Sequence, residues 1–233
     1  MEFVFEPHPY ASVAIADSEE RFPVRRIFCV GRNYEAHARE MGKDPSREAP
    51  FFFTKPADAV VDDEIPVPYP PLTSDFQHEA ELVVAIGQDA FDVAEDEAWD
   101  LIWGYAVGND LTRRDLQLEA RDKGRPWDWG KAFDRSAVCG PLHRAEAVGR
   151  LSSGSIKLSV NGTVRQDADL ADLIWSVPEI ISILSKAVEL KRGDLVFTGT
   201  PAGVGRLNVG DVCVVEIEGL GSLRTTITSS VGR

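Results

Sequence analysis

Short apolar runs, typical of β-strands, recur along most of the chain. Runs rich in β-branched and aromatic side chains, bounded by glycine, proline or polar residues, predict strands. They cover residues 26–31, 80–87, 103–108, 156–160, 195–198, 212–217 and 223–228. Asn161 and Gly162 follow the run at 156–160, and residues 163–165 continue it. This dipeptide predicts a hairpin closed by a type I′ turn.

Helical patterns are rarer, and each is bounded by recognisable start and stop signals. We expect helices over residues 34–41, 93–101, 111–123 and 179–187. Asn33 can cap the first helix, Gly42 can end it, and Pro178 can open the last. Because helices and strands do not alternate regularly, the pattern favours a β-rich α+β fold over a doubly wound parallel sheet.

Composition is that of an ordinary globular protein, with 43% hydrophobic and 27% charged residues in 233. We expect an N-terminal extension over residues 1–20, then one domain over residues 21–233 that carries the candidate site. No apolar run reaches the roughly 18 residues that a membrane-spanning helix needs. The N-terminus also lacks the basic and apolar stretches of a signal peptide.

The chain is strongly acidic, with a formal net charge of −13. Such a surface repels nucleic-acid phosphates and anionic membranes, and the sequence has no clear basic stripe, so neither is expected as a partner. Cys29, Cys139 and Cys213 are widely spaced and form no CxxC pair. This usage suits a reducing compartment, so we expect a cytoplasmic protein.

Two carboxylates lie close together where a predicted strand begins. Glu79 and Glu81 are two residues apart, so they share the strand face that continues to Val83 and Ala85. They repel each other unless a cation joins them. Asp110 follows the strand at 103–108. Carboxylate oxygens suit Mg²⁺, and also Mn²⁺ or Ca²⁺. The alternatives are a solvent-exposed strand edge for the pair and a helix N-cap for Asp110.

A histidine and a glutamate share one face of the first predicted helix. His37 and Glu40 are three residues apart. A carboxylate beside an imidazole gives a workable general base for water, although an exposed surface pair has the same spacing. The glycine-rich stretch at residues 199–205 follows a predicted strand. It is either a plain turn or a backbone loop that approaches a small anionic ligand.

Taken together, these segments resemble the fumarylacetoacetate hydrolase family over nearly the whole chain. The residues that carry the resemblance are 29–34, His37, Glu40, 53–56, 78–82, 109–117, 130–134 and 198–205. Each motif alone is weak or moderate, but their joint occurrence in this order is highly specific. The compact length is most similar to the acylpyruvase branch of that family.

The resemblance implies a fold, a reaction and a set of site residues. The fold is a mixed β-sandwich roll of the fumarylacetoacetate hydrolase C-terminal-like type, usually a homodimer. The reaction is hydrolysis of the carbon–carbon bond of an acylpyruvate, with fumarylpyruvate expected as the substrate and Mg²⁺ as the cofactor. The implied metal ligands are Glu79, Glu81 and Asp110, the implied catalytic residues are His37, Glu40 and Lys131, and the implied binding residues for the anionic 2-oxo acid are Arg32, Arg114, Gln117 and Thr200.

Three alternatives to this reading stay open. An oxaloacetate decarboxylase or a hydroxymuconate-type diacid isomerase of the same family would use the same metal and 2-oxo-acid contacts. A metal-dependent phosphohydrolase would need more histidine or aspartate ligands than the sequence offers. A non-enzymatic domain that binds a partner would show no dependence on divalent ions.

Overall fold

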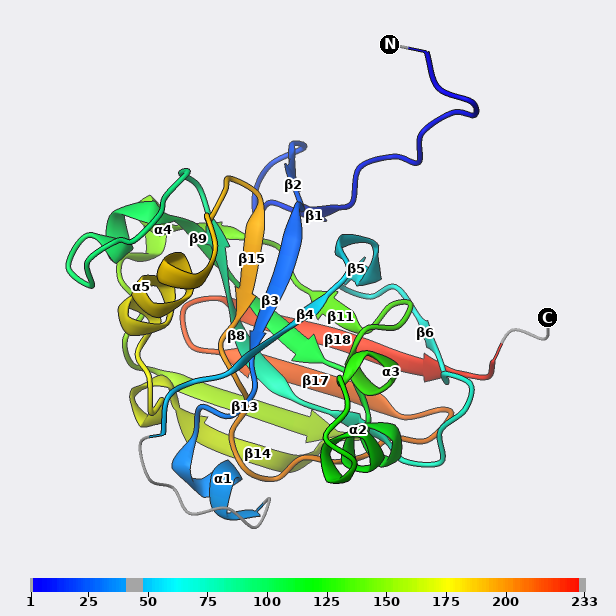
Figure 1. The fold of residues 1–233 in the computed structure, drawn as a ribbon. Helices are drawn as coiled ribbons and strands as arrows, with labels where there is room; N and C mark the ends of the chain where they lie inside the picture. Colours follow the sequence, from blue (N-terminus) through cyan, green and yellow to red (C-terminus); the bar gives the residue numbers. More distant parts are fainter. Residues whose placement is uncertain (1, 41–47, 231–233) are drawn as a thin grey trace.

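A curved, eight-stranded mixed sheet forms the centre of the computed structural model, which describes residues 2–40 and 48–230, and of residues 38–40 only the backbone. Its order is β4-β3-β15-β8-β9-β11-β5, with β12 paired to β9 (Figure 1). The strands are β3 (Arg26–Val30), β4 (Phe52–Lys55), β5 (Val60–Asp62), β8 (Ala80–Ile86), β9 (Ile102–Asp110), β11 (Ala137–Cys139), β12 (His143–Arg144) and β15 (Asp194–Phe197). β15 pairs parallel to β3 and antiparallel to β8.

A second sheet of five strands has the order β14-β13-β17-β18-β6. Its strands are β6 (Val67–Pro68), β13 (Ser155–Val160), β14 (Thr163–Asp169), β17 (Val212–Ile217) and β18 (Gly221–Thr228). Two small sheets complete the β-structure of the described residues, in the orders β10-β7-β16 and β1-β2. They contain β1 (Ser12–Ala14), β2 (Arg21–Pro23), β7 (Phe76–His78), β10 (Thr112–Arg113) and β16 (Gly205–Arg206).

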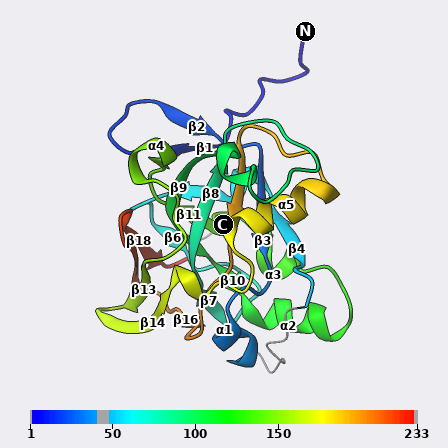
Figure 2. The same ribbon diagram turned by 90° about the vertical axis from the view of Figure 1, so that its left-hand side faces the viewer.

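The helices are short and lie around the sheets. They are α1 (Glu35–Glu40), α2 (Arg114–Asp122), α3 (Asp128–Lys131), α4 (Ala145–Val148) and α5 (Val177–Ala187), with 3₁₀ turns η1 (Ala57–Ala59), η2 (Ala98–Leu101) and η3 (Leu170–Asp172). Both views place α1 and α2 at one end of the molecule and α4 and α5 toward the other (Figures 1 and 2). No helix within the described ranges is long and apolar enough to cross a membrane.

Alternating apolar positions explain how the two large sheets pack together. In β13, Ile156 and Leu158 are buried and face the core that also contains Val215 of β17. Every residue of β8 is buried, because its two faces meet different apolar clusters. Leu82 belongs to the cluster between the sheets, and Val83 to the cluster on the opposite face. This arrangement confirms the predicted β-rich α+β fold.

The apolar runs correctly predicted strands, and the Asn-Gly dipeptide correctly predicted a hairpin turn. Each of the seven runs predicted as strands contains a strand of the structure. Asn161 and Gly162 have φ values of 50° and 77°, as a type I′ turn between β13 and β14 requires. The helix predicted at 34–41 is observed as α1, although residue 41 lies outside the described residues. The helix predicted at 179–187 is α5, which begins two residues earlier.

The helix predicted at residues 93–101 is wrong. Only η2 (Ala98–Leu101) is helical there. The Val93 N–H donates to Ser185 Oγ at 3.0 Å, and the Asp92 N–H donates to the Ser185 carbonyl at 3.0 Å. These contacts tie the segment to α5 instead of allowing it to form a helical ladder of its own.

Two predictions near α1 and α2 need correction. Residues 111–113 are not helical, because β10 (Thr112–Arg113) pairs with β7 and the helix starts only at Arg114. Asp110 therefore ends β9 and caps no helix. Asn33 does not cap α1, since its side chain contacts Trp175 and the Thr198 carbonyl instead.

The N-terminal residues are partly joined to the body of the protein. β1 pairs with β2, and Val13 is fully buried in the cluster that also contains Val83. The boundary at residue 20 between an extension and the main domain stays a prediction.

Candidate active site

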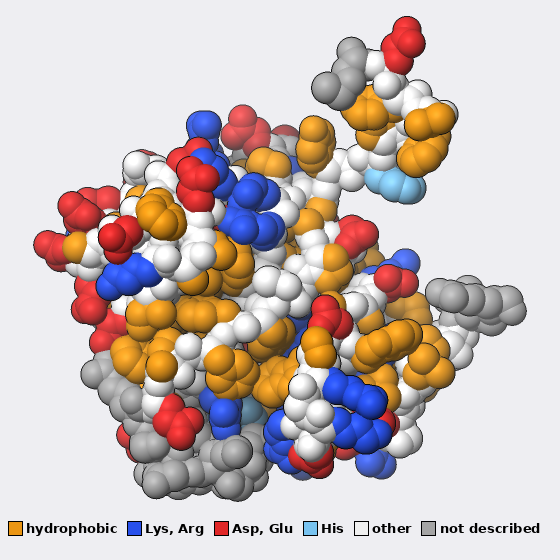
Figure 3. Space-filling view, viewed as in Figure 1, with side chains coloured by type: hydrophobic (Ala, Val, Ile, Leu, Met, Phe, Trp, Pro, Cys, Tyr) orange, Lys and Arg blue, Asp and Glu red, His pale blue; other side chains and the backbone are white. Residues whose placement is uncertain are grey.

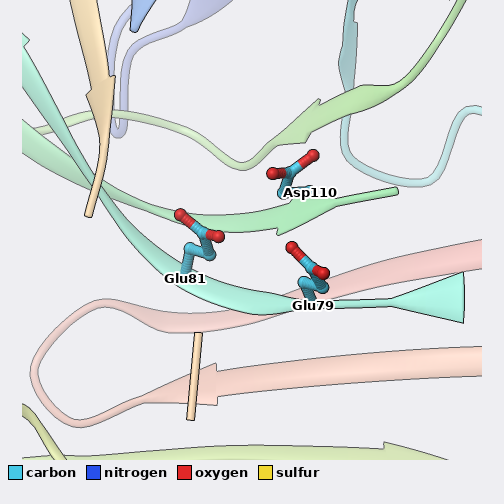
Figure 4. Close-up of side chains that lie close together, drawn as sticks. All are labelled: Glu79, Glu81 and Asp110. Carbon is cyan, nitrogen blue, oxygen red and sulfur yellow. The ribbon is translucent and has the colours of Figure 1, made fainter. Parts of the chain in front are cut away.

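Three buried carboxylates meet where β8 begins and the neighbouring strand β9 ends. Glu79 links β7 to β8, Glu81 lies in β8, and Asp110 ends β9. Their side chains point toward one another (Figure 4), with one oxygen of each within 4.8 Å of the others. Their exposures are only 4%, 1% and 0%. The alternative that Glu79 and Glu81 face solvent at a strand edge is therefore wrong.

Backbone pairing holds these carboxylates in register. The Asp110 N–H donates to the Glu79 carbonyl at 2.9 Å, and the Glu79 N–H donates to Asn109 Oδ1 at 3.0 Å. Ala80 lies opposite Asn109 in the antiparallel ladder of β8 and β9. The carboxylate oxygens thus project from paired strands of the large sheet and from the residue next to them, where a site can be held accurately.

Three buried cations balance the carboxylates. Lys131 Nζ lies 2.6 Å from Glu79 Oε2 and 2.8 Å from Asp110 Oδ2. Lys55 Nζ lies 2.7 Å from Asp110 Oδ1, and Arg114 pairs with Glu79. A buried charge is tolerated only when it is paired. The three paired cations therefore explain why three carboxylates can be buried together inside the protein.

The acids of the cluster respond differently to burial. Burial alone would raise the pKa of Glu79, but the charges of Lys131 and Arg114 outweigh it and hold that pKa well below its usual range. Burial raises the pKa of Glu81 well above its usual range, and the neighbouring charges of Asp110 and Glu79 raise it further. Burial lowers the pKa of Lys131, but Asp110 and Glu79 more than compensate and the net shift is upward.

The donor set fits a hard divalent cation. All the candidate ligand atoms are carboxylate oxygens, which Mg²⁺, Mn²⁺ and Ca²⁺ prefer over softer metals. A divalent cation would relieve the repulsion that raises the pKa of Glu81. The residues present therefore suit the metal that the sequence suggested.

The first residue of the glycine-rich loop supports Glu81. The Gly199 N–H donates to Glu81 Oε2 at 2.7 Å. Gly199 has a φ of 97°, and a Cβ at this position would lie 2.7 Å from the Cβ of Asn33. Only glycine combines this backbone conformation with such a close approach. The loop at 199–205 is thus more than a plain turn.

A cavity of about 120 Å³ opens beside the carboxylates. Most of the site residues predicted from the sequence line it, namely Arg32, His37, Glu79, Glu81, Arg114, Gln117, Lys131 and Thr200. Asp110 lies behind Lys131 and is not exposed. His37 is 4% exposed, so it does not belong to an exposed surface pair. The side chain of Glu40 lies outside the described residues.

Hydrogen bonds fix the polar side chains of this cavity. Arg114 Nε donates to Gln77 Oε1 at 2.8 Å, and the same guanidinium contacts Gln117. Gln166 Nε2 donates to Thr200 Oγ1 at 2.8 Å. The hydroxyl oxygen of Thr200 therefore acts as an acceptor toward Gln166, which holds this side chain at the cavity.

Several residues of the site were not assigned to it from the sequence. The pairing of Lys55 with Asp110 was not foreseen, although Lys55 lies inside the motif at 53–56 and was a candidate cation for an anionic substrate. Phe53, Leu118, Arg121 and Trp127 line the cavity, and Gln166 supports Thr200 from β14. No local pattern in the sequence marks Gln166, because its partners are more than thirty residues away.

Comparison with known proteins agrees with this geometry. Residues 26–228 match the family model described as fumarylacetoacetate (FAA) hydrolase C-terminal. The chain belongs to the fumarylacetoacetate hydrolase family. This result confirms the resemblance seen in the sequence, and the β-rich fold agrees with it.

Individual members of the family are similar in sequence to this chain over most of their length. The chain is 47% identical to a fumarylpyruvate hydrolase of a Ralstonia species over 79% of this chain and 95% of the relative. It is 40% identical to an oxaloacetate tautomerase of Escherichia coli, over 85% and 90% respectively. A crystal structure of fumarylpyruvate hydrolase from Pseudomonas aeruginosa, in complex with Mn²⁺ and pyruvate, is 51% identical with a TM-score of 0.97, over 98% of this chain and 100% of that one.

Proposed function

We propose that this protein is a metal-dependent acylpyruvate hydrolase that converts fumarylpyruvate to fumarate and pyruvate. The observation that carries the proposal is the buried group of Glu79, Glu81 and Asp110 beside a cavity that also contains His37 and Lys131. The Ralstonia and Pseudomonas relatives, both named fumarylpyruvate hydrolase, support this choice of substrate.

Glu79, Glu81 and Asp110 would hold the divalent cation, for which we propose Mg²⁺, with Mn²⁺ as the ion of the Pseudomonas relative. When bound, such an ion supplies a Lewis acid and a template for the carboxylate and 2-oxo oxygens of the substrate. Arg114 and Gln117 line the same cavity and offer donors to that carboxylate. Thr200 offers one further donor.

The remaining residues carry the proton and the developing charge. His37, oriented by Glu40, takes a proton from water, and the water oxygen attacks the C4 carbonyl carbon. The C3–C4 bond then breaks, its electron pair passes to C3 as a pyruvate enolate, and the acyl group is released as fumarate, whose new carboxyl group loses its proton to water. The buried Lys131 ammonium stabilises the enolate as its charge develops. The proton held by His37 returns to C3 and completes pyruvate.

The cellular setting and the assembly belong to the same proposal. We place the reaction in the cytoplasmic breakdown of aromatic compounds through gentisate, carried out by a homodimer. Residues 21–233 would be the catalytic domain and residues 1–20 an extension. The three cysteines are all buried and unpaired, which is consistent with a reducing compartment.

An activity on oxaloacetate is the second candidate. The Escherichia coli relative is named an oxaloacetate tautomerase and is 40% identical. Oxaloacetate has the same carboxylate and 2-oxo group, so the same cation and arginine would bind it. Enolisation or decarboxylation of oxaloacetate needs no attacking water and should depend less on His37.

A substrate panel tests the proposal. Initial rates are measured on fumarylpyruvate, acetylpyruvate and oxaloacetate, each with Mg²⁺, with Mn²⁺ and with EDTA. We expect the highest kcat/KM on fumarylpyruvate and its loss in EDTA. A higher kcat/KM on oxaloacetate would favour the second candidate. Turnover that is unaffected by EDTA would refute the metal-dependent mechanism.

A further inference from the structure

A second hollow adjoins the cavity at the carboxylates. Its volume is about 530 Å³, and it shares Arg32, Phe53, Trp127 and Lys131 with the inner cavity. Figure 3 shows hydrophobic side chains gathered between β4 and α2 on this face, with basic side chains on either side. The two hollows therefore adjoin each other across the four shared side chains.

The inner cavity alone is too small for a long acylpyruvate. Its volume of about 120 Å³ is below that of an engineered protein cavity of about 150 Å³ that holds one benzene molecule. A pyruvate-sized group matches that space, whereas a substrate with a further four-carbon acyl group does not. If the proposed function is correct and the 2-oxo acid end lies at the carboxylates, the acyl end must extend into the outer hollow.

Aromatic rings form the walls of the outer hollow. The rings of Phe51 and Phe53 lie 5.2 and 5.7 Å from that of Trp127, measured between centroids. A Cβ on Gly31 would lie 2.0 Å from the Phe51 ring, so glycine at this position lets Phe51 pack against the strand end. Flat, rigid apolar walls suit a planar unsaturated chain.

One cation of the two hollows differs from the others. Most of these cations are already paired with carboxylates. The pairs are Lys131 with Glu79 and Asp110, Arg114 with Glu79, and Arg121 with Asp122. Within the part of the chain that the structure describes, Arg32 has no carboxylate partner. Its guanidinium instead lies 5.1 Å from the centroid of the Phe51 ring.

This placement leaves the N–H groups of Arg32 available to a ligand. The contact of the guanidinium with the Phe51 ring involves no carboxylate, so the N–H groups of Arg32 can make a bidentate contact with a carboxylate of a ligand. Asp128, the acidic side chain of the outer hollow, is exposed to solvent, where its charge is screened.

We infer that the outer hollow is the acyl-group subsite and that Arg32 binds a carboxylate at the far end of the acyl chain. The aromatic walls hold the planar chain, and Arg32 selects acyl groups that end in an anion. The subsite therefore favours diacid acylpyruvates over acylpyruvates with a neutral acyl group. The inference deepens the proposed function and rests on it.

The test compares two substrates of the same chain length. Fumarylpyruvate carries the terminal carboxylate, and crotonylpyruvate carries a methyl group in its place. With the wild-type protein we expect kcat/KM to be about 10–100-fold higher for fumarylpyruvate, as a charge-assisted hydrogen bond would give. In Arg32→Met the ratio of kcat/KM for fumarylpyruvate to kcat/KM for crotonylpyruvate should fall to about one. Arg150→Met is the matched control, because Arg150 also stacks on an aromatic ring, Trp99 at 5.5 Å, far from the site.

Each outcome decides the matter. An equal loss on both substrates in Arg32→Met, or an unchanged preference, would overturn the role of Arg32. If Arg32→Met does not fold, the test uses Arg32→Lys and the comparison of the two substrates with the wild-type protein. A wild-type protein that does not distinguish the two substrates would also overturn the role of Arg32. Absence of cleavage of either substrate by the wild-type protein would instead refute the proposed function itself.

Discussion

Replacing Lys131 with methionine should make the stability of the protein depend on a divalent cation. The Lys131 ammonium is buried and lies 2.6 Å from Glu79 and 2.8 Å from Asp110. Methionine fills a similar volume without the charge. In the metal-free variant, Lys55 and Arg114 alone would balance the acidic cluster.

The size of the effect follows from the burial of this pair. Removing one partner of a buried ion pair costs about 3–5 kcal/mol. In a chain of this length, each kcal/mol shifts the melting temperature by about 2–4 °C. The Lys131→Met variant should therefore melt about 6–20 °C below the wild type in EDTA. A bound divalent cation places positive charge on the same carboxylates, so saturating Mn²⁺ should reduce the difference to less than half.

Thermal melts followed by circular dichroism measure this difference, in EDTA and along a Mn²⁺ titration. Lys186→Met is the matched control, since Lys186 is exposed in the last turn of α5 and should change the melting temperature little. A Lys131→Met variant that melts with the wild type in EDTA would refute the account of the buried charge cluster. If Mn²⁺ does not reduce the difference in melting temperature between Lys131→Met and the wild type, the proposal that the cation binds the same carboxylates as Lys131 is refuted.

Further predictions concern the other groups of the site and the buried thiols. His37→Ala and Glu40→Gln should each lower the hydrolysis rate about 10²–10⁴-fold. Calorimetry should show unchanged affinity for Mn²⁺ in both variants, and a parallel loss of that affinity would contradict the water-activating role. Glu81→Gln should weaken Mn²⁺ binding at least about tenfold, and equal affinity would remove Glu81 from the ligands. Gly199→Ala should lower the free energy of unfolding in urea by about 1–3 kcal/mol, because a β-carbon would meet Asn33 and the backbone is left-handed; an unchanged midpoint would contradict this. Burial raises the pKa of Cys213 to about 12, so a thiol reagent at pH 8 should label this cysteine only after unfolding, and rapid labelling of the native protein would contradict its burial.

Local patterns in the sequence predicted the cluster of three carboxylates better than the cavity around it. The two-residue spacing of Glu79 and Glu81 placed both on one strand face, and Val83 on that face is fully buried as expected. Asp110 was identified as the third carboxylate, although its place at the end of β9 differs from the expected helix junction. These features depend on the two-residue periodicity of strands, which can be detected in the amino-acid sequence.

Long-range contacts decided the features that the sequence did not reveal. Gln166 reaches the site from β14 by hydrogen bonds to Ala80 and Thr200, which are distant in sequence. The segment at 93–97 has a helical composition, but contacts with Ser185 hold it in another conformation. In both cases tertiary packing overrides the local conformational preference, and local sequence patterns do not reveal such long-range contacts.

The most direct test of the account is a product analysis of the purified protein acting on fumarylpyruvate. Proton NMR follows the reaction with saturating Mg²⁺, and a parallel sample contains EDTA. We predict fumarate and pyruvate in equal amounts with Mg²⁺, and no cleavage in EDTA. Fumarylpyruvate that remains intact with Mg²⁺, or that only exchanges between its keto and enol forms, would contradict the assignment of this buried carboxylate site to carbon–carbon bond hydrolysis.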